Sequence, residues 1–166
     1  YDPLIILGNE AHLIRPWIRD RRAQILINPD PQRGQLSSIQ IALAKLEASA
    51  AACLVWPVDH PAVPSMLAQD LIGLFCQTGA PLVLPVFSNR RGHPVIFSRT
   101  LFHELLNAPA EQGAKGVVMS RLEEAIFLET AEAAVIQDID TPDDYYNLTG
   151  ETLVSALARR GTSPHC

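Results

Sequence analysis

Cysteine, excess charge and long apolar runs are all scarce in this sequence. Its 166 residues include three cysteines, with no CxxC spacing and no His–Cys cluster, so neither a disulfide framework nor a zinc site is expected. We expect reduced thiols, with Cys53 and Cys76 filling the core and Cys166 on a polar tail. No apolar run approaches the roughly 20 residues that a membrane span needs, and no signal peptide opens the chain. These absences predict a cytoplasmic protein without a membrane partner.

Positive charge is also in short supply. The 13 Lys and Arg residues against 18 Asp and Glu residues leave a net charge of −5. This balance disfavours a protein that holds nucleic acid with a broad cationic face. A hydrophobic content of 48% excludes disorder, and the length is sufficient for one domain with a substantial core. We expect a single domain over residues 1–160 and a frayed tail over residues 161–166.

Short apolar runs, closed by turn-forming residues, alternate with helical patterns along the chain. The runs lack strict apolar–polar alternation, which is typical of buried parallel strands. Strands are expected at residues 4–7, 24–27, 53–56 and 82–87, and an antiparallel one at 94–97 after a hairpin connection at 89–92. Helices are expected at residues 36–46, 63–76, 100–106 and 122–128, and from Pro142 toward Arg160 with a break near Gly150. Residues 112–116 are expected to form a turn. The alternation predicts an α/β three-layer sandwich around a mostly parallel, Rossmann-like sheet.

Acidic residues follow two of the apolar runs, where open α/β sheets bind ligands. Asp59 is well placed to hold Mg²⁺, although it could instead stabilise a turn or cap the helix near Pro64. Thr141 followed by a proline is a helix start. Asp138 and Asp140 precede that start, in a stretch with four carboxylates within seven residues. Such carboxylates repel one another unless donors or a cation offset them, so a divalent cation is expected to hold at least one.

Two further segments carry polar groups suited to phosphate. Asn28, Gly34, Ser37 and Ser38 lead into a helix and can offer N–H and hydroxyl groups to a phosphate or a base edge, although Ser37 could be a simple helix cap. They match neither the P-loop nor the GxGxxG pattern.

Basic residues lie on two expected turns. Arg91 and His93 belong to the first, and arginine suits phosphate or carboxylate groups; a solvated loop is the alternative. Lys115 on the second could meet a phosphate or lie on an ordinary surface turn. The GxSxG pattern of a hydrolase nucleophile is absent.

Taken in order, these motifs resemble those of the molybdenum-cofactor nucleotidyltransferases of the MobA/MocA kind. The resemblance spans about residues 4–148. It rests on Asn28-Pro29 with Gly34 and Ser37-Ser38, and on residues 57–61, 91–97, 113–115 and 138–144.

The resemblance implies a nucleotide-diphospho-sugar-transferase-like fold and an Mg²⁺-dependent enzyme. Such an enzyme moves a CMP or GMP group from CTP or GTP to a phosphorylated acceptor such as molybdopterin, and releases pyrophosphate. Asp59 would be the principal Mg²⁺ ligand, with Asp140 as a second and Asp138 as its alternative. The nucleotide would be bound by Asn28, Gly34, Ser37 and Ser38, and the acceptor by Arg91, Gly92, His93 and Lys115.

The sequence departs from the family pattern in two ways. The first strand and the Gly-rich loop that cradles the triphosphate are absent, so we expect either that they precede Tyr1 or that the natural chain lacks them. His60 stands where Gln is usual, and Lys115 where Arg is commoner. A catalytically inactive binding module of the same fold and a sugar-phosphate nucleotidyltransferase are the alternatives.

Overall fold

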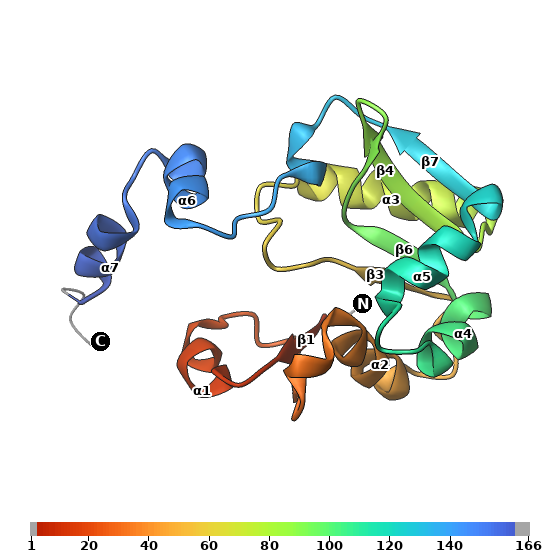
Figure 1. Cartoon of the computed structure of the whole chain (residues 1–166), viewed down its shortest axis with the longest axis horizontal. Helices are drawn as coiled ribbons and strands as arrows, with labels where there is room; N and C mark the ends of the chain where they lie inside the picture. The colour runs from red at the N-terminus through yellow and green to blue at the C-terminus, as the bar shows by residue number, and fades with distance from the viewer. Residues whose placement is uncertain (1–2, 162–166) are drawn as a thin grey trace.

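The computed structural model describes residues 3–161 (Figure 1). Its strands are β1 (Leu4–Leu7), β2 (Gln24–Ile27), β3 (Ala52–Val55), β4 (Leu82–Phe87), β5 (Arg90–Arg91), β6 (Val95–Ser98) and β7 (Ala125–Glu129). Its α-helices are α1 (Ala11–Ile14), α2 (Gln35–Lys45), α3 (Ser65–Thr78), α4 (Phe102–Asn107), α5 (Gly113–Ser120), α6 (Pro142–Thr149) and α7 (Leu153–Gly161). Short 3-10 turns are η1 (Arg15–Trp17), η2 (Pro31–Arg33), η3 (Arg99–Leu101), η4 (Leu122–Glu124) and η5 (Ala133–Ile136).

The larger sheet has the strand order β3-β6-β4-β5, and β7 pairs with β4. β6 is antiparallel to both β3 and β4, whereas β7 is parallel to β4. β3, β4 and β7 therefore point the same way, and β6 runs against them. The predicted α/β class is confirmed. The sheet is partly antiparallel because β6 returns from β4 through a short hairpin instead of a helical crossover.

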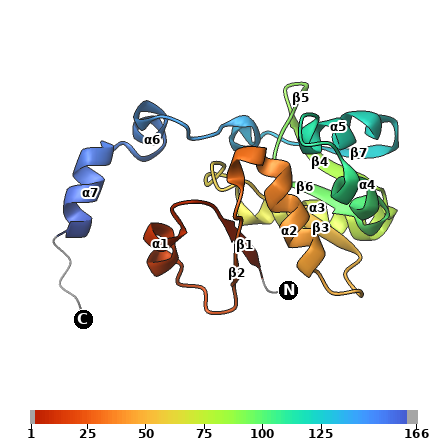
Figure 2. The same cartoon turned by 60° about the horizontal axis from the view of Figure 1, so that its bottom comes forward.

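A smaller sheet consists of β1 and β2, which run parallel in register from Leu4 opposite Gln24 to Leu7 opposite Ile27. Helix α2 lies beside this pair, between it and the larger sheet (Figure 2). Apolar residues of α2 pack against β4 in one cluster, for example Ile39 near Leu84. Helix α2 thus contacts both sheets, which places the loop at its N-terminus beside the larger sheet.

Helices cover both faces of the larger sheet, as the three-layer prediction requires. On one face α2, α4 and α5 pack against Leu82 and Leu84 of β4. On the other face α3 packs against Val83, through Leu71. Successive residues of a strand point to opposite faces, so the continuous apolar run of β4 fills both layers at once. All six residues of β4 except Phe87 are buried.

Two secondary-structure predictions were wrong. Residues 122–128 were expected to be helical, but they form η4 and then β7, which pairs with β4 from Ala125 to Glu129. As a strand, this segment forms backbone hydrogen bonds with the edge of β4. As a short helix it would leave the backbone groups of that edge without strand partners. Residues 112–116 were expected to form a turn, but helix α5 begins at Gly113 because Val117 has a buried place in the core.

The hairpin between β4 and β6 turns earlier than predicted. Ser88 and Asn89 have φ values of 48° and 61°, and they link Phe87 to its partner Arg90. Two such residues form the tight turn that matches the twist of a hairpin. The arginines therefore lie on a short strand, β5, instead of at the tip.

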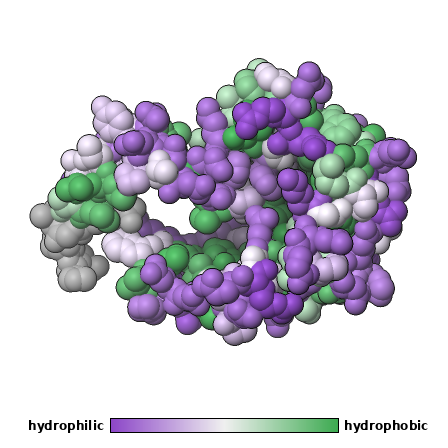
Figure 3. All heavy atoms as spheres, in the orientation of Figure 1, coloured by the Kyte–Doolittle hydropathy of each residue, from purple (hydrophilic) through white to green (hydrophobic). Residues whose placement is uncertain are grey.

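The predicted C-terminal helix and its break are confirmed. Helix α6 ends at Thr149, Gly150 follows as its C-cap with a φ of 71° that favours glycine, and α7 comes next. Among residues 3–161, none from α6 or α7 belongs to a core cluster. Figures 1 and 2 show both helices extending away from the sheets, and Figure 3 shows an opening between them and the rest of the molecule. The predicted frayed tail lies, apart from Gly161 at the end of α7, outside the described residues.

The cysteine prediction needs a correction. Cys76 is exposed on α3, so its expected place in the core was wrong, whereas Cys53 on β3 is half-buried and packs against the core. Burial raises the pKa of the Cys53 thiol. Cys166 lies outside the described residues. Among residues 3–161, no helix has the length and apolar character needed to cross a membrane.

Candidate active site

Asp59 lies on a turn that follows β3. The N–H of His60 donates to the carbonyl of Pro57 at 3.2 Å, and the Trp56 indole donates to the carbonyl of His60 at 3.0 Å. The Asp59 side chain is 43% exposed, yet its Oδ1 is buried and has no hydrogen-bond partner among residues 3–161. A buried carboxylate oxygen without a donor is unusual, because its desolvation is then uncompensated. The turn is therefore held by hydrogen bonds of its neighbours, whereas Oδ1 of Asp59 is left without a donor among the described residues.

The stretch that contains Asp138 and Asp140 lies beside this turn. The N–H of Ile139 donates to the carbonyl of Asp59 at 2.9 Å. Both flanking carboxylates are exposed. Within the described residues, no group of three or more His, Cys, Asp and Glu side chains is arranged to hold a metal ion. The structure thus brings the two acidic segments together through their backbones, without forming a metal site made of protein ligands alone.

Part of the acidic run has a structural role. The carboxylate of Asp144 accepts from the N–H of Thr141 at 2.8 Å, and the Thr141 hydroxyl accepts from the N–H of Asp144 at 3.2 Å. This reciprocal pair is a capping box at the start of α6. The side-chain and backbone hydrogen bonds from Thr141 lower the pKa of Asp144. Donors therefore offset one of the four carboxylates, and Asp138 and Asp140 are left to face solvent.

The side chain of Asn28 organises the loop before α2. It is buried, and its amide donates to the hydroxyls of Ser37 at 2.8 Å and Ser38 at 3.0 Å. Its Oδ1 accepts from the N–H of Asp30 at 3.0 Å. The Ser37 hydroxyl in turn donates to the carbonyl of Gly34 at 2.7 Å. Asn28 and Ser37 thus hold the loop. Among the described residues the half-buried Ser38 hydroxyl only accepts, so its proton is available for a ligand.

Gly34 is required by its backbone geometry. Its φ of 82° with ψ of −179° lies in a region that residues with a Cβ essentially avoid. Apart from its chain neighbours, no described residue has an atom within 4 Å of the place where a Cβ would be, so this stretch of backbone is open to an approaching group. A hollow on the surface beside this loop is lined partly by Asn28, Arg33 and Gln40. Arg33 was not identified from the sequence, because a single exposed arginine in a polar loop carries no distinctive signal.

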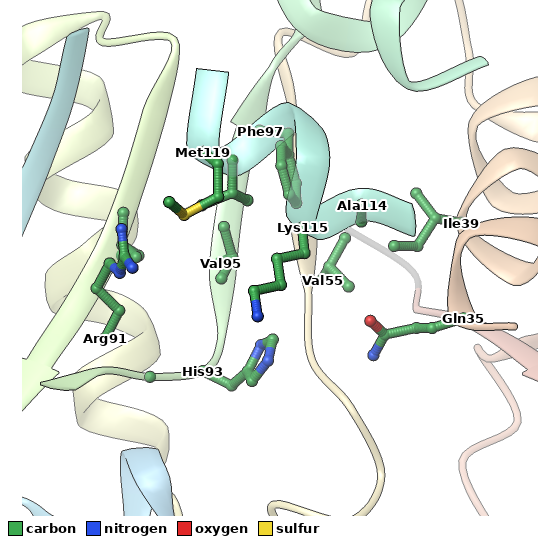
Figure 4. Close-up of a pocket in the computed structure, with 13 residues that line it drawn as sticks. Gln35, Ile39, Val55, Arg91, His93, Val95, Phe97, Ala114, Lys115 and Met119 are labelled. Atoms are coloured by element: carbon green, nitrogen blue, oxygen red, sulfur yellow. The ribbon is translucent and has the colours of Figure 1, made fainter. Parts of the chain in front are cut away.

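A pocket of about 310 Å³ lies between α2, α5 and the larger sheet (Figure 4). Its polar lining residues are Gln35, Arg91, His93 and Lys115; its other lining residues are Ile39, Val55, Leu84, Gly92, Val95, Phe97, Ala114, Val118 and Met119. In Figure 4 the Lys115 side chain extends from α5 toward the His93 ring, and Gln35 points in from α2. None of the described residues that line this pocket is acidic, so it favours an anionic ligand with an apolar part.

The structure brings Arg91, Gly92, His93 and Lys115 together around this pocket. Gly92 is buried, and a Cβ there would lie 2.7 Å from the carbonyl carbon of Val135, so the absence of a side chain lets η5 pack closely. The N–H of His93 donates to the Val135 carbonyl at 2.8 Å. Gly92 thus shapes the wall of the pocket without offering a side chain to a ligand.

The His93 ring forms the boundary between the pocket and the Asp59 turn. Its centroid lies 5.0 Å from that of His60, and its Nδ1 is buried without a hydrogen-bond partner among residues 3–161. Burial lowers the pKa of His93, the neighbouring His60 lowers it further, and the Asp59 carboxylate opposes both effects. His93 is therefore neutral near pH 7. His60 was not selected from the sequence, although its position next to Asp59 was the available signal.

Comparison with known proteins agrees with this arrangement. Residues 1–125 match the model of the MobA-like NTP transferase domain. The chain belongs to the MobA-like NTP transferase family. It is therefore a nucleotidyltransferase with a Rossmann-like fold. The chain is 24% identical over 138 residues to the molybdenum cofactor cytidylyltransferase of Escherichia coli K12, covering 83% of this chain and 67% of that protein.

Solved mycobacterial structures share the fold. Rv0371c from Mycobacterium tuberculosis H37Rv superposes with a TM-score of 0.78 at 25% identity, covering 91% of this chain and 77% of that one. A manganese complex of the same protein superposes with a TM-score of 0.77 at 24% identity, covering 92% and 79%.

Proposed function

We propose that this MobA-like nucleotidyltransferase moves a CMP or GMP group from CTP or GTP to a phosphorylated small molecule such as molybdopterin. The observation that carries the proposal is the pocket beside the Asp59 turn, whose walls are apolar and whose charged lining residues are basic. An apolar wall suits a ring system, and arginine and lysine suit a phosphate group. The likeness to a molybdenum cofactor cytidylyltransferase supports CTP as the first nucleotide to test.

We propose that the divalent cation is Mg²⁺, held by Asp59 with Asp140 as a second ligand, or Asp138 in its place. The buried, unpartnered Oδ1 of Asp59 fits this role. One or two carboxylates together with phosphate oxygens are the usual ligand set of Mg²⁺, so a larger cluster of protein ligands is not needed. The manganese complex of the mycobacterial relative supports a divalent cation. When bound, the cation supplies positive charge beside the phosphates.

The chain's own residues contribute position and charge. The loop from Asn28 to Ser38 is proposed to bind the nucleotide through the open backbone at Gly34 and the free hydroxyl proton of Ser38. Arg91, His93 and Lys115 are proposed to hold the acceptor, so that one of its phosphate oxygens faces the α-phosphorus of the nucleotide. That oxygen forms a bond to the α-phosphorus. The bond between the α-phosphorus and the oxygen that bridges it to the β-phosphate breaks, and pyrophosphate leaves. Orientation and electrostatic stabilisation suffice, without a covalent enzyme intermediate.

The test is pyrophosphate release from each of the four nucleoside triphosphates with Mg²⁺, with and without molybdopterin as acceptor. We expect release that depends on the acceptor with CTP or GTP. Release with a sugar phosphate instead would favour a sugar-phosphate nucleotidyltransferase. A folded chain that releases pyrophosphate under none of these conditions would contradict the proposal and favour a binding module.

The variant Asp59→Asn tests the proposed role of Asp59 as a cation ligand. It keeps the size of the side chain but removes the negative charge, so we expect roughly a 10²–10³-fold lower rate, as for the loss of a main electrostatic contact. The matched control is Asp70→Asn, an exposed carboxylate on α3, which should leave the rate unchanged. An Asp59→Asn rate equal to that of the control would contradict the assignment of Asp59.

A further inference from the structure

Two consecutive carbonyls of η5 hold the two histidines beside Asp59. The carbonyl oxygen of Ala134 lies 3.4 Å from Nδ1 of His60, and that of Val135 accepts from the N–H of His93. The two rings are 5.0 Å apart and inclined at 54°. His60 belongs to the same turn as Asp59, and His93 belongs to the acceptor pocket. One short turn therefore contacts the ring of His60 and the backbone N–H of His93, one residue from each of these sites.

The Ala134 contact favours the tautomer of His60 that carries a proton on Nδ1. A carbonyl oxygen can only accept, so Nδ1 must be the donor. In the neutral ring, Nε2 then has a lone pair, and it lies 4.0 Å from Oδ1 of Asp59. Two acceptors do not hydrogen-bond, and this distance is beyond hydrogen-bond range in any case. Nε2 of His60 therefore gives no hydrogen bond to the Asp59 carboxylate.

The burial of His60 adds a second effect. Its side chain is only 9% exposed, and it lies against the buried Oδ1 of Asp59. A ring in that position occupies space from which water could otherwise donate to the carboxylate oxygen. It also leaves the carboxylate less room to change rotamer. An oxygen that is fixed, buried and without a donor is suited to a cation.

We propose that His60 is a positioning residue: its ring, anchored to the Ala134 carbonyl, holds the Asp59 carboxylate available to the divalent cation and holds His93 in the wall of the acceptor pocket. The inference rests on the proposed function, because it takes Asp59 as the cation ligand. Replacing a residue that orients a metal ligand, without binding the metal itself, commonly lowers metal affinity by roughly 10–100-fold.

The experiment uses the full chain with ¹³C-labelled histidine rings, titrated with Mn²⁺ alone. Paramagnetic Mn²⁺ broadens nearby ring signals in proportion to its occupancy and proximity. In the unmodified chain we expect the signals of His60 and His93 to broaden well before those of His12 and His103, which lie on α1 and α4. Added Mg²⁺ should reverse the broadening by competition.

Three variants separate the contributions of His60, with the His93 signal as the reporter. His60→Ala removes both the ring and the donor, and His60→Phe keeps a ring but cannot donate to Ala134. Both should lower the broadening of His93 per added Mn²⁺ by about tenfold or more. His60→Gln provides an amide donor for the same carbonyl and should restore most of the effect. Should the alanine variant fail to fold, the phenylalanine and glutamine pair still makes the comparison.

Asp59→Asn separates failure of this inference from failure of the proposed function. If Asp59→Asn abolishes the broadening while the folded His60→Ala or His60→Phe variant behaves like the unmodified chain, His60 does not position the carboxylate and the inference is overturned. Equal losses in His60→Phe and His60→Gln would also overturn it, because the donor to Ala134 would then have no role. If Asp59→Asn leaves the broadening unchanged, the cation assignment itself is wrong.

Discussion

At the scale of single residues, hydrogen-bond partners separate structural groups from groups available to a ligand. Asn28 uses both its amide and its carbonyl oxygen within its own loop. Asp59 Oδ1 and His93 Nδ1 are buried and have no such partner within residues 3–161. Residue types alone do not reveal this difference, since Asn, Asp and His are all polar. The orphaned atoms are the ones that a ligand can satisfy.

Gly92 gives a prediction about stability. Gly92→Ala places a methyl group against the carbonyl of Val135, so we expect the free energy of unfolding to fall by about 1–3 kcal/mol, as for overpacking in a core. Urea denaturation measures the change. The matched control is Gly73→Ala in helix α3, where a Cβ would meet no described residue within 4 Å beyond the helix's own backbone and where alanine is the better helix former. A Gly92 variant as stable as this control would show that η5 can move aside.

His93 gives a prediction about pH. Its pKa is lower in the folded chain than the ordinary value of 6.5, so the unfolded chain binds the proton more readily. The contribution of neutral His93 to stability is therefore present above about pH 6.5 and is lost as the pH falls through the folded pKa. Urea denaturation at a series of pH values should show a steeper acid decline in the unmodified chain than in His93→Gln. His12→Gln, an exposed histidine, serves as the control, and an unchanged slope in His93→Gln would contradict the prediction.

At the scale of elements, the sequence predicted secondary structure correctly where neighbouring residues determine it, and wrongly where a segment distant in the chain determines it. Thr141, Pro142 and the acids after them start α6 as predicted, because a capping box uses only neighbouring residues. Residues 125–129 form a strand because β4 offers an open edge, and that edge lies about 40 residues earlier in the chain. Short apolar segments of this kind adopt the structure that their neighbours permit.

The cap of α6 can be tested directly. Thr141→Ala removes the hydroxyl that accepts from the N–H of Asp144, so α6 should lose about 1 kcal/mol of helix stability. Faster amide exchange within Pro142–Thr149 measures this loss, and Thr141→Ser should preserve the cap. The pKa of Asp144, now lowered by Thr141, should rise toward its ordinary value in the alanine variant, as a ¹³C titration of the carboxyl group can show. Because that pKa is lowered, the carboxylate's contribution is lost only as the pH falls through it.

At the scale of the whole molecule, the candidate site is assembled from segments distant in sequence. Its pocket is lined by α2, β3, the β4–β6 hairpin and α5, and the Asp59 turn and η5 contact the hairpin at His93. Helix α2 contacts both the smaller sheet and the cluster on the larger one. A ligand that bridges these segments stabilises the folded state over the unfolded chain.

Ligand binding should therefore raise the melting temperature. With CTP or GTP and Mg²⁺ at about 100 times the dissociation constant, the free energy of unfolding should rise by about 2.7 kcal/mol. Thermal melts with each nucleotide, with and without Mg²⁺, measure the effect. The part that depends on Mg²⁺ should disappear in Asp59→Asn and persist in Asp70→Asn. Equal increments for all four nucleotides would argue against a preference for CTP or GTP.

The sequence by itself determined the α/β class, most of the strands and the start and break of the C-terminal helices. Apolar runs, helix caps and Gly150 determine strands and helix ends through residues nearby in the chain, so these elements can be predicted from the sequence pattern. Only the tertiary structure decided that β7 is a strand, that α5 is a helix, and that His60 lies between Asp59 and His93. Those outcomes depend on contacts between distant segments, whose burial and hydrogen bonding exist only once the chain has folded.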